Sequence, residues 1–254
     1  MPTAVTGDHP TPLATTGHSP TGHSPTGRPV ALVTGATGGM GTAIVAELSS
    51  THDVVALGRS SAALDALAAT TGCRTQLLEL TDFAAFASVA DALPRVDVLV
   101  HAAAIAPRLA VAAASVDDWE LVLRSNVIAP AELTRVLLPQ LRAAEGTVVF
   151  IGSGAGTRAI PGSAVYTASK HALKAIADVL RIDEASTRLR VATVAPGQTD
   201  TPLLRSGNES AGEPYEPEKY IRPSSVADAV RFVVDAPADV HITDIAVRPR
   251  RELA

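Results

Sequence analysis

Short apolar runs alternate with longer amphipathic stretches from residue 29 almost to the end of the 254-residue chain. The runs are nearly unbroken Val, Ile, Leu and Ala, which is typical of parallel strands covered on both faces. The stretches between them repeat apolar residues at helical spacing. The alternation predicts an α/β fold: a Rossmann-like, doubly wound sheet of about seven mainly parallel strands, flanked by helices.

The boundaries follow from the apolar runs and the residues that interrupt them. We expect strands at Val30–Thr34, Asp53–Leu57, Thr75–Leu80, Val96–Ala102, Thr147–Gly152, Arg190–Val194 and His241–Val247. We expect helices at Gly41–Ser49, Ala62–Thr70, Phe83–Leu93, Val116–Ala144, Ser163–Thr187 and Ser224–Asp235. No boundary splits residues 29–254, so we expect one domain. The polar segment Leu203–Arg222 contains Gly and Pro without clear periodicity and is interpreted as irregular chain.

The first 28 residues differ from the rest of the chain. They are rich in Thr, Pro, Gly, His and Ser, and the unit Thr16–Pro20 recurs at once as Thr21–Pro25. Such a segment cannot bury enough apolar surface to offset its conformational entropy, so residues 1–28 are predicted to be a disordered extension. A metal-binding tail is the alternative. Solvated linker histidines are favoured over it, because no histidine pair has helix-face spacing.

Composition and charge narrow the range of partners. Hydrophobic residues make up 46 % of the chain, and the net charge of −5 argues against a protein that coats nucleic acid. The single cysteine, Cys73, excludes an intramolecular disulfide and a Cys-based zinc cluster. No apolar run reaches about 18 residues, so we expect no membrane span. We expect a cytoplasmic protein without a metal site, and we interpret the run Arg248–Arg251 as a solvated tail.

A glycine-rich segment, Thr34–Gly41, joins the first expected strand to the first helix. Its glycines Gly35, Gly39 and Gly41 stand where the chain turns sharply, and they let backbone N–H groups approach a diphosphate at the helix N-terminus. A tight turn without a ligand is the alternative. The spacing differs from that of nucleoside-triphosphatase loops.

The end of the second strand bears on the choice of cofactor. An NAD site usually has Asp or Glu here to hold the ribose 2′-hydroxyl, whereas this chain has Arg59 followed by Ser60. A guanidinium suits a 2′-phosphate, which it can bind with two hydrogen bonds, and the Ser60 hydroxyl could add another. The sequence therefore favours NADP(H). The alternative is that Arg59 is merely solvated.

A tyrosine and a lysine stand four residues apart in a strong helical pattern. Tyr166 and Lys170 therefore lie on one helix face. Tyrosine ordinarily has a pKa of about 10, and a neighbouring ammonium is expected to lower it. Ser153 follows the fifth expected strand, at the sheet edge where such folds bind ligands.

Taken together and in this order, Thr34–Gly41, Asn126, Ser153 and the pair Tyr166 and Lys170 resemble the short-chain dehydrogenase/reductase family, in its single-domain branch. The resemblance covers about residues 29–249. It implies that Tyr166 is the general acid in reduction or the base in oxidation, and that Lys170 lowers the pKa of Tyr166 and holds the nicotinamide ribose.

The resemblance also implies that Ser153 binds the substrate carbonyl. Asn126 would bend the long helix locally and anchor a proton-relay water. The family commonly has Asn-Asn-Ala-Gly after the fourth strand, where this chain has His101-Ala102-Ala103-Ala104. His101 is interpreted as structural rather than catalytic.

Further positions are assigned by the same resemblance. The remaining cofactor-binding candidates are Thr37, Met40, Glu79, Leu80, Ala102, Pro196, Gly197, Thr199 and Thr201. The candidates for an apolar substrate pocket are Ile160, Val165, Leu203 and Leu204. The segment near residues 198–222 is expected to form a lid that excludes water from the reaction.

These observations favour an NADP(H)-dependent enzyme that interconverts a ketone or aldehyde and an alcohol by hydride transfer. A non-catalytic dinucleotide-binding sensor is the first alternative, but it would be expected to lack Tyr166 or Lys170. The second is an epimerase or dehydratase on the same fold, but such relatives usually carry a substrate domain larger than the short segment after Gly197. We expect a small-molecule carbonyl or alcohol substrate and a homodimer or homotetramer, formed through the two longest helices.

Overall fold

The computed structural model describes residues 27–251. The extension predicted over residues 1–28 therefore lies outside the described residues, apart from its last two. Seven parallel strands form one sheet in the order β3-β2-β1-β4-β5-β6-β7. The predicted Rossmann-like α/β fold is confirmed.

Every expected strand and helix is present, with ends that differ by up to four residues. The strands are β1 (Val30–Thr34), β2 (Asp53–Gly58), β3 (Arg74–Leu77), β4 (Val98–His101), β5 (Thr147–Ile151), β6 (Arg190–Pro196) and β7 (Asp244–Val247). The helices are α1 (Gly39–Leu48), α2 (Ser61–Thr71), α3 (Phe86–Asp91), α4 (Val116–Leu123), α5 (Ala129–Ala143), α6 (Ala164–Asp183), α7 (Pro202–Ala211) and α8 (Pro223–Val234).

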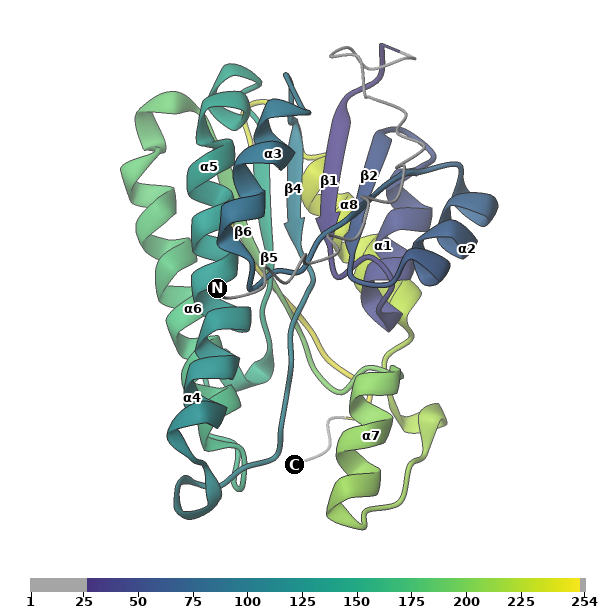
Figure 1. Cartoon of the computed structure of the whole chain (residues 1–254), viewed down its shortest axis with the longest axis vertical. Helices are drawn as coiled ribbons and strands as arrows, with labels where there is room; N and C mark the ends of the chain where they lie inside the picture. The colour runs from purple at the N-terminus through teal and green to yellow at the C-terminus, as the bar shows by residue number, and fades with distance from the viewer. Residues whose placement is uncertain (1–26, 252–254) are drawn as a thin grey trace, which may run out of the picture.

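Helices cover both faces of the sheet. Helices α1, α2 and α8 lie on one side, and α3, α5 and α6 lie on the other (Figure 1). Alternate residues of β1 belong to the two cores: Ala31 and Val33 pack toward α1 and α8, whereas Val30 and Leu32 pack toward α3 and α5. This two-sided burial explains why the strands are apolar without interruption.

The strand order reverses between β1 and β4, which are neighbours in the sheet. In open parallel sheets, such a switch point leaves a crevice outside the carboxyl ends of the strands. Helices α4 and α7 lie beyond that edge, on opposite sides of it (Figure 1). A binding site is therefore expected at this edge of the sheet.

The long helix expected over Val116–Ala144 is interrupted. A π-helical turn at Arg124–Ile128 separates α4 from α5 and contains Asn126, where the sequence predicted a bend. Pro130 gives a physical reason. It has no N–H to donate to the carbonyl of Asn126 four residues earlier, and its ring crowds that carbonyl. One widened turn relieves both problems.

The interpretation of Leu203–Arg222 as irregular is wrong for its first half, where α7 forms. Thr201 caps this helix by accepting a hydrogen bond from the amide N of Leu204 at 3.3 Å, and Pro202 occupies its first turn. Gly212 ends it with a left-handed φ of +67°. The helix is polar overall, and its only large apolar side chains are Leu203 and Leu204, so no apolar repeat can be followed along it. The start and stop residues were the readable signal.

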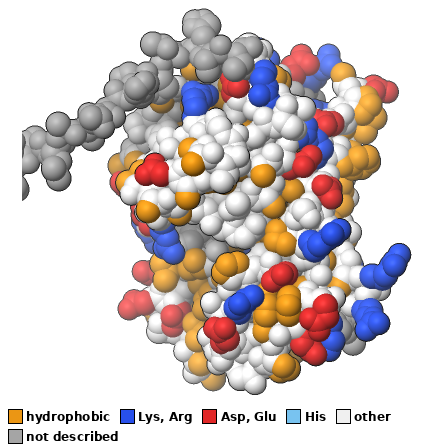
Figure 2. All heavy atoms as spheres, turned by 90° about the vertical axis from the view of Figure 1, so that its right-hand side faces the viewer, with side chains coloured by type: hydrophobic (Ala, Val, Ile, Leu, Met, Phe, Trp, Pro, Cys, Tyr) orange, Lys and Arg blue, Asp and Glu red, His pale blue; other side chains and the backbone are white. Residues whose placement is uncertain are grey.

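The described surface and helices show two further features. On the face drawn in Figure 2, acidic and basic side chains are interspersed with apolar ones, including over the lower part that contains α7. Among the helices of residues 27–251, none is long and apolar enough to cross a membrane.

His101 ends β4 and is buried at the centre of the sheet. Its ring stacks on Phe150 of β5 with centroids 5.0 Å apart. Its Nε2 lies 2.8 Å from the Thr134 hydroxyl, which itself donates to the carbonyl of Pro130 at 2.7 Å. Nε2 must then be the donor to Thr134, so the ring is the neutral Nε2–H tautomer. Burial lowers the pKa of His101 to about 3, which supports the structural interpretation.

This burial predicts an acid sensitivity. As the pH falls below 6.5, the unfolded chain takes up a proton at His101 that the folded chain binds only near pH 3. Stability is therefore lost in that window, by up to roughly 5 kcal/mol from this one group. We expect His101→Asn to flatten the dependence of the unfolding free energy on pH between 6.5 and 4, measured by urea unfolding. A substitution of the exposed His171 serves as the control. Parallel curves for wild type and His101→Asn would contradict the assignment.

Candidate active site

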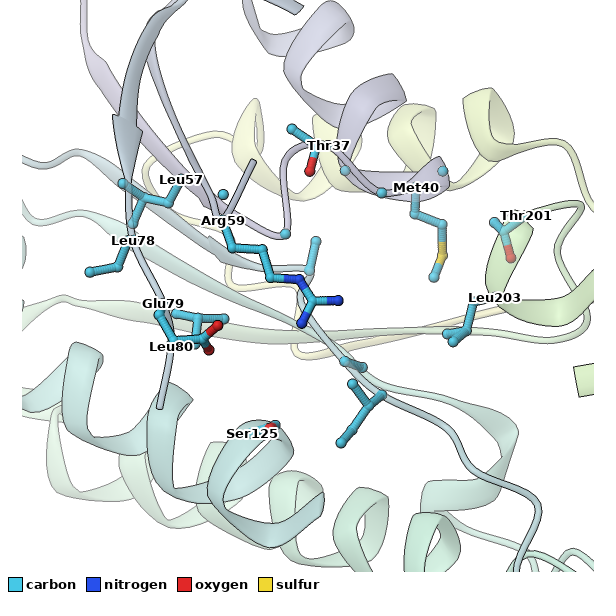
Figure 3. Close-up of a pocket in the computed structure, with 18 residues that line it drawn as sticks. Thr37, Met40, Leu57, Arg59, Leu78, Glu79, Leu80, Ser125, Thr201 and Leu203 are labelled. Carbon is cyan, nitrogen blue, oxygen red and sulfur yellow. The ribbon is translucent and has the colours of Figure 1, made fainter. Parts of the chain in front are cut away.

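A cavity of about 360 Å³ opens at the carboxyl ends of the central strands (Figure 3). Its walls come from the β1–α1 loop, the end of β2, the chain after β3, the loop after β4, the π-helical turn and the start of α7. The sequence-predicted residues that line it are Gly35, Thr37, Gly39, Met40, Gly41, Arg59, Glu79, Leu80, Ala102, Thr201 and Leu203. The lining residues that sequence reasoning missed are Gly38, Leu57, Gly58, Leu78, Ala104, Ile105 and Ser125. Most of these residues directly precede or follow a predicted site residue in the sequence, and that adjacency was the signal that could have found them.

The glycine loop is packed so closely that side chains are excluded from it. A Cβ on Gly35 would lie 2.6 Å from the Cα of Ala103, and Gly35 has a left-handed φ of +61°. A Cβ on Gly41 would lie 2.1 Å from the carbonyl oxygen of Gly35. Gly38 precedes α1, and no side-chain hydrogen bond caps the helix there. This cradle at a helix N-terminus fits the diphosphate of a dinucleotide.

Arg59 follows β2, and its guanidinium extends into the cavity (Figure 3). Ser60 is outside the lining and caps α2, where its hydroxyl accepts a hydrogen bond from the amide N of Ala63 at 3.3 Å. The hydroxyl keeps its own proton to donate. Across the cavity, Glu79 accepts hydrogen bonds from the backbone N and the hydroxyl of Thr81, both at 3.2 Å. The adenine end of a dinucleotide would therefore meet one cation and one carboxylate.

The structure brings Ser153, Tyr166 and Lys170 together. Ser153 follows β5, and its side chain lies close enough to Tyr166, near the start of α6, to lower the pKa of that phenol in part. One turn later, the Lys170 ammonium donates to the carbonyl of Ile151 at 2.9 Å and lies 5.8 Å from the centre of the Tyr166 ring. The strand end and the first turns of α6 thus hold a hydroxyl, a phenol and an ammonium in one group.

Burial dominates the electrostatics of this group. It raises the pKa of Tyr166, and the hydrogen bond with Ser153 lowers that pKa only in part. Burial also lowers the pKa of Lys170 to about 8. For the pKa of Tyr166, the net direction is opposite to the expected one, since desolvation of the phenol outweighs any lowering by Lys170. The ammonium is held by the carbonyl of Ile151, and its distance from the phenol ring leaves desolvation as the larger effect.

Asn126 is buried in the π-helical turn, and hydrogen bonds occupy its whole amide. Its Oδ1 accepts from the amide N of Ile105 at 2.9 Å, and its Nδ2 donates to the carbonyl of Ile105 at 2.8 Å. Nδ2 also donates to the Ser169 hydroxyl at 3.1 Å, which donates to the carbonyl of Tyr166 at 2.7 Å. Asn126 thereby fastens the loop after β4 to the helix of Tyr166 and Lys170.

The residues after β6 continue the same edge. The amide N of Gly197 donates to the carbonyl of Val247 at 2.8 Å, and the Thr199 hydroxyl donates to the carbonyl of Gly197 at 3.1 Å. The Thr201 hydroxyl caps α7 and donates to the carbonyl of Thr199 at 3.2 Å. This turn is fixed by its own hydrogen bonds. Pro196, Gly197 and Thr199 lie outside the lining of the 360 Å³ cavity.

The expected substrate-pocket residues differ in exposure. Leu203 borders the cavity and is exposed, and Ile160 is also exposed. Leu204 is half-buried, and Val165 is completely buried in the described structure. Within residues 27–251, no group of three or more His, Cys, Asp or Glu side chains is arranged to hold a metal ion.

Comparison with known proteins decides the family. The family model described as short chain dehydrogenase matches residues 29–212. This chain belongs to the short-chain dehydrogenase/reductase family. It is accordingly an oxidoreductase that uses a nicotinamide cofactor and acts on small molecules.

Individual relatives agree with this membership. The chain is 33 % identical to sulfoacetaldehyde reductase 2 of Chromohalobacter salexigens, with 88 % of this chain and 95 % of the relative covered. It is 32 % identical to the NADP-dependent 3-hydroxy acid dehydrogenase YdfG of Salmonella typhi, with 87 % and 94 % covered. The solved closed form of a serine dehydrogenase complexed with NADP+ is 28 % identical, with a TM-score of 0.78 and 86 % and 94 % covered.

In this short-chain dehydrogenase/reductase, the segment around α7 is internally organised. Asn208 donates hydrogen bonds to the carbonyl of Pro214 at 3.0 Å and to the Tyr220 hydroxyl at 3.1 Å. The rings of Tyr215 and Tyr220 are 5.2 Å apart, and the Tyr215 hydroxyl donates to Asp200. Both tyrosines therefore have a structural role in this segment.

One ion pair joins this segment to the opposite side of the edge. The Arg108 guanidinium, in the loop after β4, lies 2.6 Å from the carboxylate of Glu213, just after α7. Both side chains are partly exposed, so the pair contributes little to overall stability. Its position is informative, because it connects two segments that approach the candidate site from different parts of the chain.

The buried ammonium of Lys170 predicts a stability cost. The unfolded chain keeps this proton up to about pH 10.5, whereas the folded chain releases it near pH 8. The penalty is therefore full below pH 8 and is relieved as the pH rises to 10.5. We expect Lys170→Met to raise the unfolding free energy at pH 7 by at most about 3 kcal/mol. Loss of the hydrogen bond to the carbonyl of Ile151 makes this gain smaller. The gain should shrink in urea titrations between pH 8 and 10.

Lys174, one turn further along α6, supplies the matched control. Burial lowers the pKa of Lys174, but hydrogen bonds with Asp244 and Asp178 raise it on balance. Lys174→Met should therefore give no stability gain at pH 7. If Lys170→Met were less stable than wild type at pH 7 by a margin that stayed constant up to pH 10, the assigned cost would be wrong.

Proposed function

We propose that this chain is an NADP(H)-dependent oxidoreductase that interconverts a ketone or aldehyde and an alcohol. The observation that carries the proposal is the grouping of Ser153 with Tyr166, with Lys170 buried one turn away, at the sheet edge that also holds the glycine cradle. Such an arrangement provides a proton donor beside a position for a carbonyl.

Each side chain has a distinct role in the proposed reaction. The Ser153 hydroxyl donates a hydrogen bond to the carbonyl oxygen and stabilises its developing negative charge. The Tyr166 phenol transfers its proton to that oxygen as the alcohol forms. Lys170 stabilises the resulting phenolate and would hold the nicotinamide ribose. The bound cofactor supplies the hydride, while the protein supplies position and electrostatics.

The choice of NADP(H) over NAD(H) rests on Arg59. Its guanidinium extends into the cavity at the end of β2, where a 2′-phosphate would lie (Figure 3). A guanidinium can bind a phosphate with two parallel hydrogen bonds. The Salmonella relative is an NADP-dependent dehydrogenase, and the similar serine dehydrogenase structure is a complex with NADP+, which agrees with this choice.

We also propose a cytoplasmic homodimer or homotetramer. Apolar side chains stay exposed along the surfaces of α4, the π-helical turn and α6, where the sequence favoured contacts between subunits. The exposed residues are Leu121, Ile128, Val179 and Ile182. Burial of these side chains against a second copy would remove apolar surface from water. The single cysteine, Cys73, is buried and free, as suits a reducing compartment.

Removal of the Arg59 side chain tests the cofactor. We expect Arg59→Ala to weaken NADPH binding 10- to 100-fold, because charge-assisted hydrogen bonds to the 2′-phosphate are lost. The affinity for NADH should stay within about threefold, since NADH has no such phosphate. Titrations followed by nicotinamide fluorescence measure both. Arg95→Ala, at the opposite end of the sheet, is the control. Equal losses for NADPH and NADH would argue against the 2′-phosphate contact.

Substitution of Tyr166 tests the reaction. A panel of aldehydes and ketones, assayed by the loss of NADPH absorbance, first identifies a substrate. We expect Tyr166→Phe to lower kcat/KM for that substrate by about 10²- to 10⁴-fold, since proton transfer is lost. NADPH binding should change little. Absence of reduction across the panel, or full activity of Tyr166→Phe, would overturn the proposed function.

A further inference from the structure

We propose that Arg124 is a positioning residue for the cofactor. From the π-helical turn, it holds in place the adenine wall, which we define as Glu79 and Leu80. This inference deepens the proposed function and rests on it, because it concerns the same cofactor site. It comes from an arginine to which neither the glycine cradle nor the proposed reaction assigns a role.

The adenine wall follows β3 and lines the cavity (Figure 3). The chain before the wall is fixed by a backbone hydrogen bond, because the amide N of Leu78 donates to the carbonyl of Gly58 at 2.8 Å. Gly58 ends β2 and directly precedes Arg59. One end of the wall is therefore tied to the strand that also presents the cation for a 2′-phosphate.

The other end of the wall is fixed by Arg124. Its Nη2 donates to the carbonyl of Thr81 at 3.3 Å, and its guanidinium carbon lies 4.7 Å from the centre of the Phe83 ring. The face of an aromatic ring attracts a guanidinium electrostatically. One side chain thus contacts the chain just after the adenine wall at two points.

Thr81 connects these contacts with the wall itself. Its amide N and its hydroxyl both donate to Oε1 of Glu79 at 3.2 Å. The amide N of Asp82 donates to the carbonyl of Glu79 at 3.0 Å, which closes a turn. Displacement of the Thr81 carbonyl would therefore displace the carboxylate that lines the cavity.

Little else holds this part of the chain. Strand β3 is at the edge of the sheet and pairs with β2 alone. Glu79 is exposed, and Leu80 and Thr81 are only half-buried. A segment with so few buried apolar contacts opens easily unless polar contacts fix it. The contacts of Arg124 are therefore the ones on which the position of the wall depends.

Arg124 itself is attached to fixed parts of the molecule. It begins the π-helical turn, in which Ser125 lines the cavity and Asn126 is hydrogen-bonded to the loop after β4 and to α6. On the other side, the ring of Phe83 lies 5.7 Å from that of Phe86, which is completely buried. The guanidinium thus joins the adenine wall to the turn that also fixes the catalytic helix.

This arrangement has a consequence for cofactor binding. Without the guanidinium, the wall has several accessible positions, and a bound adenine nucleotide must order it. That ordering costs free energy at each binding event. The cost applies to every ligand with an adenine nucleotide, whether or not it carries a 2′-phosphate. Arg124 differs in this respect from Arg59, whose proposed contact NADH lacks.

The binding of three nucleotides tests the inference. We expect Arg124→Met to weaken NADPH, NADH and 2′,5′-ADP by a similar factor of about ten, measured by calorimetric titration. Arg124→Lys keeps a charge near the Phe83 ring and should recover part of the affinity. The midpoint of urea unfolding should stay that of wild type, because the side chain is exposed. Arg135→Met, in an exposed ion pair within α5, is the matched control and should bind all three like wild type.

The pattern across the three nucleotides decides the outcome. Unchanged affinity for NADPH in Arg124→Met would refute the proposal. Weaker binding of NADPH and 2′,5′-ADP with unchanged NADH would indicate a direct contact with the 2′-phosphate and would also overturn it. Weaker binding of both dinucleotides with unchanged 2′,5′-ADP would locate the effect at the nicotinamide end, which is equally incompatible with the inference.

Phe83 provides a second variant. Phe83→Leu removes the ring beneath the guanidinium and should weaken NADPH and NADH alike, by about threefold. In the double variant with Arg124→Met, the loss should remain near tenfold rather than reach thirtyfold, because both changes release the same contact. Fully multiplied losses would show that the two residues act separately and would contradict the proposed arrangement.

Amide hydrogen exchange gives a readout that needs no cofactor. Residues 78–83 should exchange faster in Arg124→Met than in wild type, whereas α6 should be unchanged. Equal exchange in this segment would reject the role of Arg124, even if carbonyl compounds are reduced. Faster exchange and weaker nucleotide binding, without reduction of any compound in the panel, would reject the proposed reaction and keep the role of Arg124.

Discussion

The buried amide of Asn126 connects the parts of this site. Its three hydrogen bonds join the π-helical turn to the loop after β4 at Ile105 and to α6 at Ser169. Ile105 lines the cavity, and Ser169 lies between Tyr166 and Lys170. Burial makes each of these bonds costly to lose, because the freed amide groups would find no water. The wall of the cavity and the helix of the phenol and the ammonium are therefore fixed relative to each other by one side chain.

The π-helical turn makes that connection compatible with a long helical segment. In an uninterrupted α-helix, the carbonyl of Asn126 would need an N–H from residue 130, which is a proline here. The widened turn resolves the conflict at Arg124–Ile128, and Ser125 of the same turn reaches the cavity. Pro130 also contributes its carbonyl to the Thr134 hydroxyl, which partners His101. One local irregularity thus supports both the site and the centre of the sheet.

Sequence reasoning predicts most of this fold because burial on both faces leaves an apolar signal in every strand and an amphipathic signal in most helices. It misses α7, in which only Leu203 and Leu204 are large and apolar and whose ends are marked by the Thr201 cap and Gly212. It places the glycine loop and Arg59 at the cavity, since these depend on local chain geometry. It fails for Arg248 of the expected solvated tail, because only the fold brings this guanidinium to the carbonyl of Ala195, which accepts a hydrogen bond from Nη1 at 2.5 Å. The pKa of Tyr166 was misjudged for a similar reason. Spacing along a helix gives the proximity of a charge, whereas desolvation depends on everything that packs around the phenol.

The opposing effects of burial on Tyr166 and Lys170 bear on the proposed reaction. A phenol is ordinarily protonated at neutral pH, and burial extends this form to higher pH; it is the form that would donate a proton in the proposed carbonyl reduction. Oxidation of an alcohol needs the phenolate, which is scarce until the pH rises or a cation stabilises it. Lys170 can supply that cation only while it keeps its own proton, which it releases near pH 8. Oxidation would therefore need both a deprotonated Tyr166 and a protonated Lys170. A rise in pH favours the Tyr166 phenolate but removes the proton from the Lys170 ammonium that stabilises it. Reduction meets no such conflict, since below pH 8 both groups hold the protons that the step requires. In the proposed reaction, both protons that the reduction step requires are therefore in place near neutral pH.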